Sequence, residues 1–397
     1  MFILHYFSLT VLTFLAVQDL VLSLTSSDKI ISYGYPLEIY QTKTEDDALL
    51  GMERIPHGKR FNGTIGRPVI LMCGLLSISF PYVMTNVSMA YSLADAGFDV
   101  WLLNHRAMGL SKNVIDPKTG KKRKLSQINW NYSIHELGVY DFPAVVDFVL
   151  NHTKYSKVDV VDISLGTGIL LIGLSERPEY NAKIRNNIMI APAVRNAHTL
   201  GLRPFQLRYA QIAFPVFIRV LKRLKFFALS LNPDNNILGY FCRNIFYYHC
   251  LAIMIYFDGF LNSIDHKTVA DIFTTHPQLA SSKYYIHVLQ LLQSGRFQNF
   301  DYGPIENIKH YNSTIVPEYN VTKVTAPSII IYSKDDLVVS PADIKWLLNN
   351  MPNIKETYFI QKVPFSHFTF LLGEKAHTVL HPYIVKKLLE DGKKNTL

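Results

Sequence analysis

The sequence predicts an α/β fold, a mostly parallel β-sheet with helices on both faces and an inserted helical cap. Three observations support this prediction. Short, continuous apolar runs recur along the chain and end at turns or polar residues. Segments with helical spacing alternate with them, and strands that are apolar throughout are typical of a parallel sheet covered on both faces. A long stretch rich in aromatic and aliphatic residues, from about 203 to 300, then interrupts the alternation.

The apolar runs define the expected strands. Residues 33–56 have an extended character with strand-like pieces, and five later runs read as buried strands, at 69–72, 100–103, 158–163, 187–191 and 328–332. Helical spacing is found at 140–150 and again after Ile163, through Leu174. The simplest account of 203–300 is a cap over the carboxyl-terminal edge of the sheet, where sites in open α/β sheets lie. Ordinary buried helices would have the same composition, so that alternative stays open.

The N-terminus indicates passage through the secretory pathway. Residues 1–23 are apolar and end near small residues, which favours a cleaved signal peptide followed by one domain over 24–397. A membrane anchor is the alternative, although Gln18 and Asp19 interrupt the apolar run. Six N-x-S/T sequons occur, at Asn62, Asn86, Asn131, Asn151, Asn312 and Asn320. Together with the apolar leader, these sequons predict a secreted or lysosomal glycoprotein.

Cysteines and charge narrow the class of protein further. Cys242 and Cys250 are close enough in sequence to form a short disulfide loop in an oxidising lumen, and two buried thiols are the alternative. The three cysteines lack the spacing of a zinc site, so we expect no metal and no other cofactor. The net charge of +9 is modest and the basic residues are mostly scattered, which indicates a solvated surface and no nucleic-acid site.

A candidate nucleophile follows the expected strand at 158–163. Ser164 lies between that strand and a helix, with Gly166 two residues later. A sharp turn of this kind lifts the serine hydroxyl clear of the sheet and places a helix N-terminus beneath a developing negative charge. The usual pattern is G-x-S-x-G, and here Asp162 occupies its first position. Taken alone, a serine at such a turn is more often a helix cap.

Two further residues complete a candidate catalytic triad. Asp336 follows a late apolar strand, and His367 lies near the end of the chain. His367 would accept the proton of Ser164, and Asp336 would fix the imidazole tautomer and stabilise the imidazolium. The order Ser, Asp, His is that of α/β-hydrolases. An oxyanion hole needs two backbone donors, which we expect from Leu165 and Leu75.

At this point the sequence resembles the acid-lipase family that includes gastric lipase and lysosomal acid lipase. The similarity covers nearly the whole mature chain, in ordered runs at 33–36, 44–46, 54–58, 93–102 with Asn104 and Arg106, 132–141, 174–181, 294–297, 301–303 and 319–320. The resemblance implies an α/β-hydrolase fold with a helical cap, no metal, and hydrolysis of esters of long-chain fatty acids.

The chain departs from the family pattern around the triad. The family has H-G-L where this chain has Cys73-Gly74-Leu75, and G-H-S-Q-G where it has residues 162–166, DISLG. Thr369 stands where the family has Asp. If Asp162 is charged and poorly solvated, it could bind His367 or repel the oxyanion. We also expect apolar contacts to replace the family's polar ones, which would loosen the site.

These features predict a serine ester hydrolase, a lipase that cleaves fatty-acyl esters such as triacylglycerols or sterol esters through an acyl-enzyme. We expect its partners to be the lipid ester and a lipid–water interface, and the protein to be a monomer. The altered elbow and oxyanion loop support one alternative, a catalytically impaired, lipase-like lipid-binding protein. No pattern in the chain supports a nucleic-acid partner.

Overall fold

The computed structural model describes residues 25–61, 63–116, 118–125, 131–198, 241–243, 245–258, 264–278 and 280–393. The predicted signal peptide at 1–23 lies outside the described residues, and so does the first part of the predicted cap, up to residue 240.

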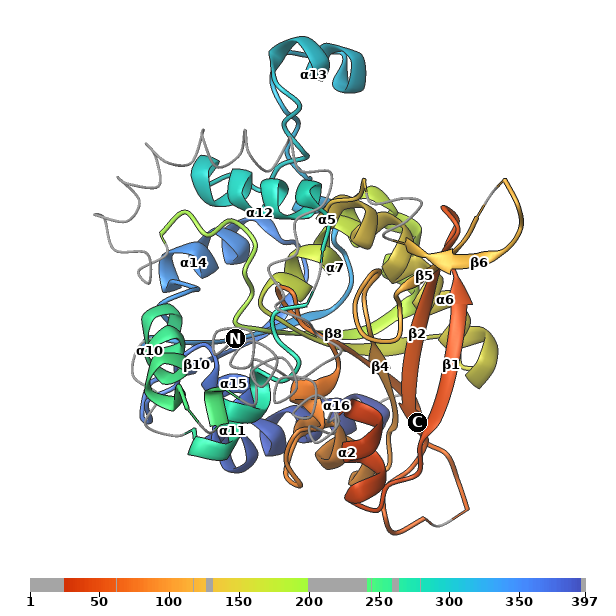
Figure 1. The fold of residues 1–397 in the computed structure, drawn as a ribbon, viewed down its shortest axis with the longest axis vertical. Coiled ribbons are helices and arrows are strands. Elements are labelled where there is room, and N and C mark those ends of the chain that lie inside the picture. The colour runs from red at the N-terminus through yellow and green to blue at the C-terminus, as the bar shows by residue number, and fades with distance from the viewer. Residues whose placement is uncertain are drawn as a thin grey trace, which may run out of the picture.

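A mixed sheet of ten described strands runs through the molecule (Figure 1). Its order is β10-β9-β8-β7-β3-β4-β2-β5-β6, and β1 pairs with β2. The strands are β1 Glu38–Lys43, β2 Ala48–Ile55, β3 Pro68–Met72, β4 Asp99–Leu103, β5 Asn113–Ile115, β6 Lys122–Lys124, β7 Val158–Ile163, β8 Ile184–Ile190, β9 Ser328–Ser333 and β10 Ile354–Ile360. Strands β4, β3, β7, β8, β9 and β10 pair in parallel, whereas β1, β2, β5 and β6 pair antiparallel. The predicted fold class is confirmed.

The apolar runs coincide with the central strands. β7 has the predicted bounds, and β3, β4, β8 and β9 overlap their predicted runs to within a few residues. The sequence did not predict β10, an edge strand that contains three consecutive polar residues, Lys355, Glu356 and Thr357, and whose side chains are mostly partly or fully exposed. An edge strand lacks the continuous apolar run that marks a strand buried on both faces, so this signal was absent there.

Helices cover both faces of the sheet. They are α2 Ser26–Ser32, α3 Met89–Asp95, α5 Ile134–Glu136, α6 Phe142–Thr153, α7 Leu165–Glu176, α10 Tyr247–Asp258, α11 His266–Ile272, α12 Ser282–Ser294, α13 Pro304–Tyr311, α14 Pro341–Asn350, α15 Thr369–Leu372 and α16 His381–Lys393. A π-helical turn over Leu137–Asp141 leads into α6.

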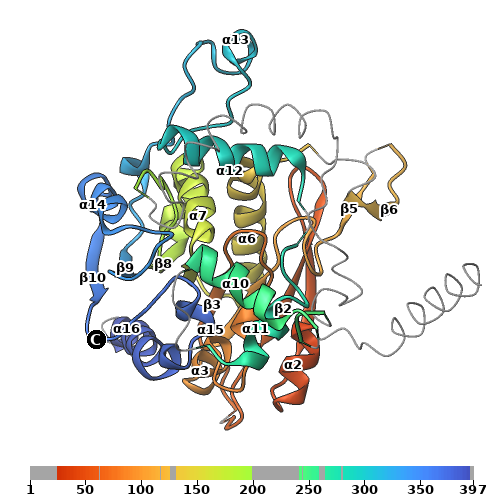
Figure 2. The same ribbon diagram turned by 60° about the vertical axis from the view of Figure 1, so that its left-hand side comes forward.

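Two apolar cores lie on opposite faces of the sheet. Ile70 and Met72 of β3 join a core with α6 and α7, while Val69 and Leu71 join one with α3, α15 and α16. Successive side chains of a strand point to opposite faces, so β3 is packed from both sides. In Figure 2, α6 and α7 lie together on one side, apart from α3, α15 and α16.

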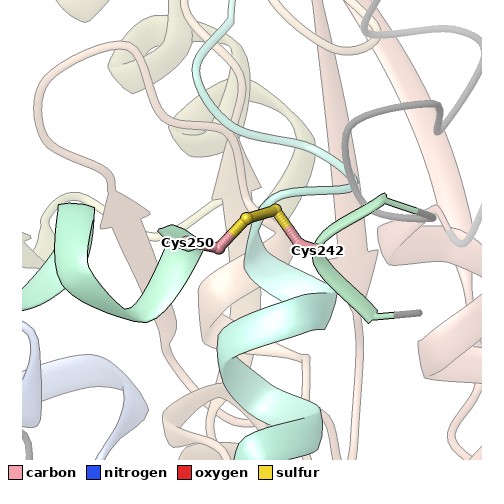
Figure 3. Close-up of a disulfide and its surroundings, with 2 residues drawn as sticks. All are labelled: Cys242 and Cys250. Carbon is pink, nitrogen blue, oxygen red and sulfur yellow. A yellow bond between two sulfur atoms is a disulfide. The ribbon is translucent and has the colours of Figure 1, made fainter. Parts of the chain in front are cut away.

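The described part of the predicted cap is helical. Helices α10, α11 and α12 lie within 203–300, and α13 follows on an extension that projects from the body of the molecule (Figure 1). A disulfide joins Cys242 to Cys250 at the start of α10, with an Sγ–Sγ distance of 2.02 Å (Figure 3). None of the described helices combines the length and the apolar character needed to cross a membrane.

Candidate active site

Ser164 occupies a strained turn between β7 and α7. Its backbone angles are φ 56° and ψ −127°, a conformation that costs a non-glycine residue on the order of 1–3 kcal/mol and must be held by its surroundings. Hydrogen bonds supply that support, since the Ser164 N–H donates to Ile190 O and the Ser164 carbonyl accepts from the N–H groups of Thr167 and Ala193. The sharp turn predicted from the sequence is therefore present.

Gly166 permits the close approach that this turn requires. A Cβ at Gly166 would lie 2.7 Å from Cys73 O and 3.1 Å from Met72 O. The first turn of α7 therefore packs directly against the end of β3. Any larger side chain would push the helix away from the loop after β3, which explains why the last position of the elbow pattern is glycine even though its first position is not.

The side chains of the candidate triad form a hydrogen-bonded series through His367. His367 Nε2 is 2.8 Å from Ser164 Oγ, and His367 Nδ1 is 2.9 Å from Asp336 Oδ2. Asp336 Oδ1 accepts the N–H groups of Val338 at 2.8 Å and Val339 at 2.9 Å. Those two bonds fix the carboxylate in the loop after β9. The carboxylate then orients the imidazole toward the serine.

The loop after β3 lies against the nucleophile. A Cβ at Gly74 would be 2.9 Å from Ser164 Cβ and 3.4 Å from Ser164 Oγ, so only the bare backbone fits there. Leu75, the expected second oxyanion donor, is the next residue. Leu165 is the first residue of α7, where N–H groups have no partner within the helix. Both expected donors therefore belong to backbone segments that adjoin Ser164.

Asp162 is buried beneath the elbow and does not bind His367. The Thr167 hydroxyl donates to Asp162 Oδ1, and Oδ2 has no hydrogen-bond partner in the described structure. Burial raises the pKa of Asp162 to about 8, and the hydrogen bond from Thr167 opposes this by lowering the pKa. Asp162 therefore makes no contact with His367, whose two imidazole nitrogens are engaged by Ser164 and Asp336, and its raised pKa favours the neutral carboxyl.

Cys73 also makes a polar contact, contrary to the expected apolar one. Its thiol is buried and donates to Ile78 O at an Sγ–O distance of 2.7 Å. Burial raises the pKa of this thiol, which keeps it protonated. The bond closes the loop from Cys73 to Ile78 on itself. Thr369, the third departure from the family pattern, shares a 2.8 Å hydrogen bond with Ser366, next to His367.

The described sequon asparagines lie at the surface of the molecule. Five of the six sequon asparagines are described, and all five are exposed at the surface: Asn86, Asn131, Asn151, Asn312 and Asn320. Asn62 lies outside the described residues.

Among the described residues, no group of three or more His, Cys, Asp or Glu side chains is arranged to hold a metal ion. A cavity of about 510 Å³ between β1 and α6 contains none of the three triad residues, so the candidate chemistry rests on the triad geometry.

The fold and this site define an α/β-hydrolase. Two family models match the chain, the partial alpha/beta-hydrolase lipase region over residues 26–86 and the alpha/beta hydrolase fold over residues 67–213. Gastric triacylglycerol lipase of Rattus norvegicus is 31% identical, with 92% of this chain and 91% of the relative covered. Lipase 3 of Drosophila melanogaster is also 31% identical, with 91% of this chain and 92% of the relative covered. The chain therefore belongs to the acid-lipase family, and it is an enzyme of the lipase-type ester hydrolases.

Solved structures show the same fold. The monoglyceride lipase of Saccharomyces cerevisiae, solved with a substrate analogue, superposes with a TM-score of 0.55 at 15% identity, covering 90% of this chain and 95% of that one. At this identity the match concerns the fold alone.

Proposed function

We propose that the chain is a serine lipase that hydrolyses fatty-acyl esters, such as triacylglycerols or sterol esters, through an acyl-enzyme on Ser164. The observation that carries this proposal is the hydrogen-bonded series from Ser164 through His367 to Asp336 at a strained strand–turn–helix. Such a series activates a hydroxyl that is otherwise a poor nucleophile. The names of the relatives support the ester class.

The reaction then has two stages. In acylation, Ser164 Oγ attacks the ester carbonyl while His367 Nε2 takes the hydroxyl proton, and His367 returns that proton to the departing alcohol. In deacylation, His367 removes a proton from water, which attacks the acyl carbonyl; His367 then gives that proton to Ser164 Oγ as the bond to the acyl group breaks and the fatty acid leaves. Asp336 stabilises the imidazolium in both stages. The oxyanion of each tetrahedral intermediate accepts hydrogen bonds from the N–H groups of Leu165 and Leu75.

The test is turnover and labelling of Ser164. Purified protein would be incubated with p-nitrophenyl palmitate and with a fluorophosphonate probe. We expect Ser164→Ala to abolish both labelling and turnover, because triad members act as a unit and their loss costs orders of magnitude. Ser175→Ala is the matched control, since Ser175 is a buried serine on α7 that bonds only to Ile172 O in the described structure. A folded parent that neither labels nor turns over would refute the proposal.

A second candidate function, an impaired lipid-binding relative, is favoured by one observation. Asp162 keeps an unpartnered oxygen buried directly beneath the elbow, and an unsatisfied buried polar atom weakens the preorganisation of a site. This reading expects Asp162→Gly combined with Cys73→His to create ester turnover that the parent lacks. Equal turnover in the parent and the double variant counts against it.

The location and assembly of the protein form part of the same proposal. Exposure of the five described sequon asparagines and the Cys242–Cys250 disulfide support folding in the secretory pathway. We expect a monomeric, secreted or lysosomal glycoprotein that acts at lipid–water interfaces. Digestion with an N-glycosidase should increase its electrophoretic mobility, and light scattering should give the mass of one glycosylated chain. An unchanged mobility or a dimer mass would contradict these expectations.

A further inference from the structure

The connector between α11 and α12 touches the loop that carries the expected second oxyanion donor. The Gln278 N–H donates to Leu76 O at 2.9 Å. His276 Nε2 lies 2.6 Å from Ser77 Oγ, a distance at which the two share a hydrogen bond. Both contacts join segments about 200 residues apart in sequence, so they connect the described part of the predicted cap to the loop after β3.

One of these contacts falls on Leu76, a residue with an unfavourable backbone conformation, and the other falls on the next residue, Ser77. Leu76 has φ 48°, in the left-handed region that a leucine adopts only at an energetic cost. Its carbonyl is held by Gln278, and its N–H points toward Tyr284 Oη at 3.5 Å. The peptide groups on both sides of Leu76 are therefore restrained from the cap side. These restraints also determine the orientation of Leu75, the preceding residue.

The connector is itself braced against the body of the fold. Gln278 Oε1 accepts the N–H of Gly109 at 3.2 Å, in the loop after β4, and Gln278 Nε2 donates to Thr275 O. Farther along, the Ser281 hydroxyl donates to Tyr132 O and caps α12 by accepting the Tyr284 N–H at 3.0 Å. Because the connector is hydrogen-bonded to the core at two points, it can hold the loop that it contacts in a fixed position.

We infer that His276 and Gln278 are positioning residues that hold the loop from Gly74 to Ser77, and with it the Leu75 donor, in the geometry needed for the oxyanion hole. The inference rests on the proposed function for its catalytic consequence. Neither residue is assigned a contact with substrate. Gln278 acts through the backbone of the loop, at Leu76 O, and His276 acts through the side chain of Ser77.

The consequence is selective for the transition state. An oxyanion donor is used when negative charge develops on the carbonyl oxygen, so a displaced donor lowers kcat and leaves substrate binding nearly unchanged. Complete loss of a donor costs on the order of a hundredfold or more in rate. Loss of one contact that restrains the loop, with the donor still present, should cost on the order of tenfold.

The test compares two replacements of His276 in the full-length protein. His276→Leu removes the bond to Ser77 and the 2.9 Å contact of Nδ1 with Thr275 Oγ1, whereas His276→Gln keeps an amide group near the position of Nε2. We expect kcat for p-nitrophenyl palmitate to fall about tenfold in the leucine variant with KM within about twofold, and to recover in the glutamine variant. Ser77→Ala should resemble His276→Leu, and the two changes together should cost no more than either alone.

A second readout needs no catalysis. Amide hydrogen exchange of the peptide over residues 73–80 should be faster in His276→Leu than in the parent or in His276→Gln. The matched control is His381→Leu, which removes a similar 3.1 Å His–Ser contact, to Ser92, between α16 and α3. It should leave exchange at 73–80 and kcat as in the parent.

The outcomes separate this inference from the proposed function. A folded parent without ester turnover would refute the proposed function, while exchange at 73–80 would still report on the contact. The inference is overturned if His276→Leu leaves exchange at 73–80 unchanged. It is also overturned if His276→Leu, His276→Gln and His381→Leu lose kcat equally, because that pattern would reflect general destabilisation.

Discussion

Asp162 shows how one residue changes character when it is buried. The family pattern has glycine at this position, and an exposed aspartate there would carry a charge next to the nucleophile. In the structure its carboxyl is fully enclosed and bonded to the Thr167 hydroxyl, and burial raises its pKa to about 8. The side chain therefore acts as a neutral polar group beneath the elbow at the pH of most compartments.

This shift makes stability depend on pH in a defined direction. The carboxyl has a pKa of about 8 in the folded chain and an ordinary value of 3.8, so the folded state binds the proton more tightly. Its contribution to stability is present in full below about pH 4 and is lost as pH rises toward about pH 8, by at most about 1.4 kcal/mol per pH unit.

Asp162→Asn removes this titration, so we expect a flatter curve of unfolding free energy against pH than in the parent. Urea denaturation at several pH values measures it. A parallel pair of curves for the two proteins would mean that Asp162 is not the source.

At the scale of elements, α7 is placed by close backbone approaches on two sides. Gly166 brings its first turn against Cys73 O, and Gly173 brings its later turns against the π-helical turn over Leu137–Asp141, where a Cβ would lie 2.7 Å from Gly138 O. These two glycines therefore set how closely α7, the helix that follows the elbow, approaches the neighbouring segments. Side-chain packing by Ile169 and Ile172 in the core fills the remaining space.

Gly173→Ala tests this packing. In most helices alanine is better than glycine by up to about 1 kcal/mol. Here the added methyl would also lie 2.8 Å from Phe142 Cδ1, so α7 or α6 must shift. We expect a net loss of about 1–3 kcal/mol in the free energy of unfolding, measured by chemical denaturation. A stabilised variant would show that the two segments move apart at little cost.

At the scale of the whole molecule, three of the sequence runs that carry the family resemblance meet at one ion-pair cluster. Arg106, in the loop after β4, contacts Asp141 at 2.6 Å and Asp46 at 2.6 Å. Asp46 lies in the turn between β1 and β2, and Asp141 lies just before α6. These matched residues therefore stabilise the fold, joining the antiparallel part of the sheet to the helical layer that packs on β7.

Removal of one member of this cluster should be costly. Arg106→Leu leaves Asp141 buried without its partner, and we expect a loss of about 3–5 kcal/mol in the free energy of unfolding. The control is Arg177→Ala, which breaks contacts to the exposed carboxylates of Glu45 and Glu179 and should cost less than about 1 kcal/mol. Thermal denaturation of both variants measures the difference. Similar losses in both variants would show that burial does not determine how much the Arg106 ion pairs contribute to the free energy of unfolding.

The sequence by itself determined the class of fold and the family, and it placed Ser164 and Asp336 after apolar strands. It could do so because apolar runs mark strands that are buried on both faces, and because parallel strands deliver the residues that follow them to one edge of the sheet. His367 was predicted from its place near the end of the chain and from the order Ser, Asp, His. The position of Ser164 in a turn between a strand and a helix follows from the local sequence, without reference to contacts between distant segments.

Only the tertiary structure decided the properties of the residues around that series. The neutral state of Asp162 depends on its enclosure, the bond of Cys73 depends on how the loop closes, and the contact from His276 to Ser77 depends on how the cap docks. Burial and hydrogen-bond partners are set by segments far apart in the chain, and no local pattern of residues encodes them. The candidate triad predicted from the sequence thus acquires its supporting groups only in three dimensions.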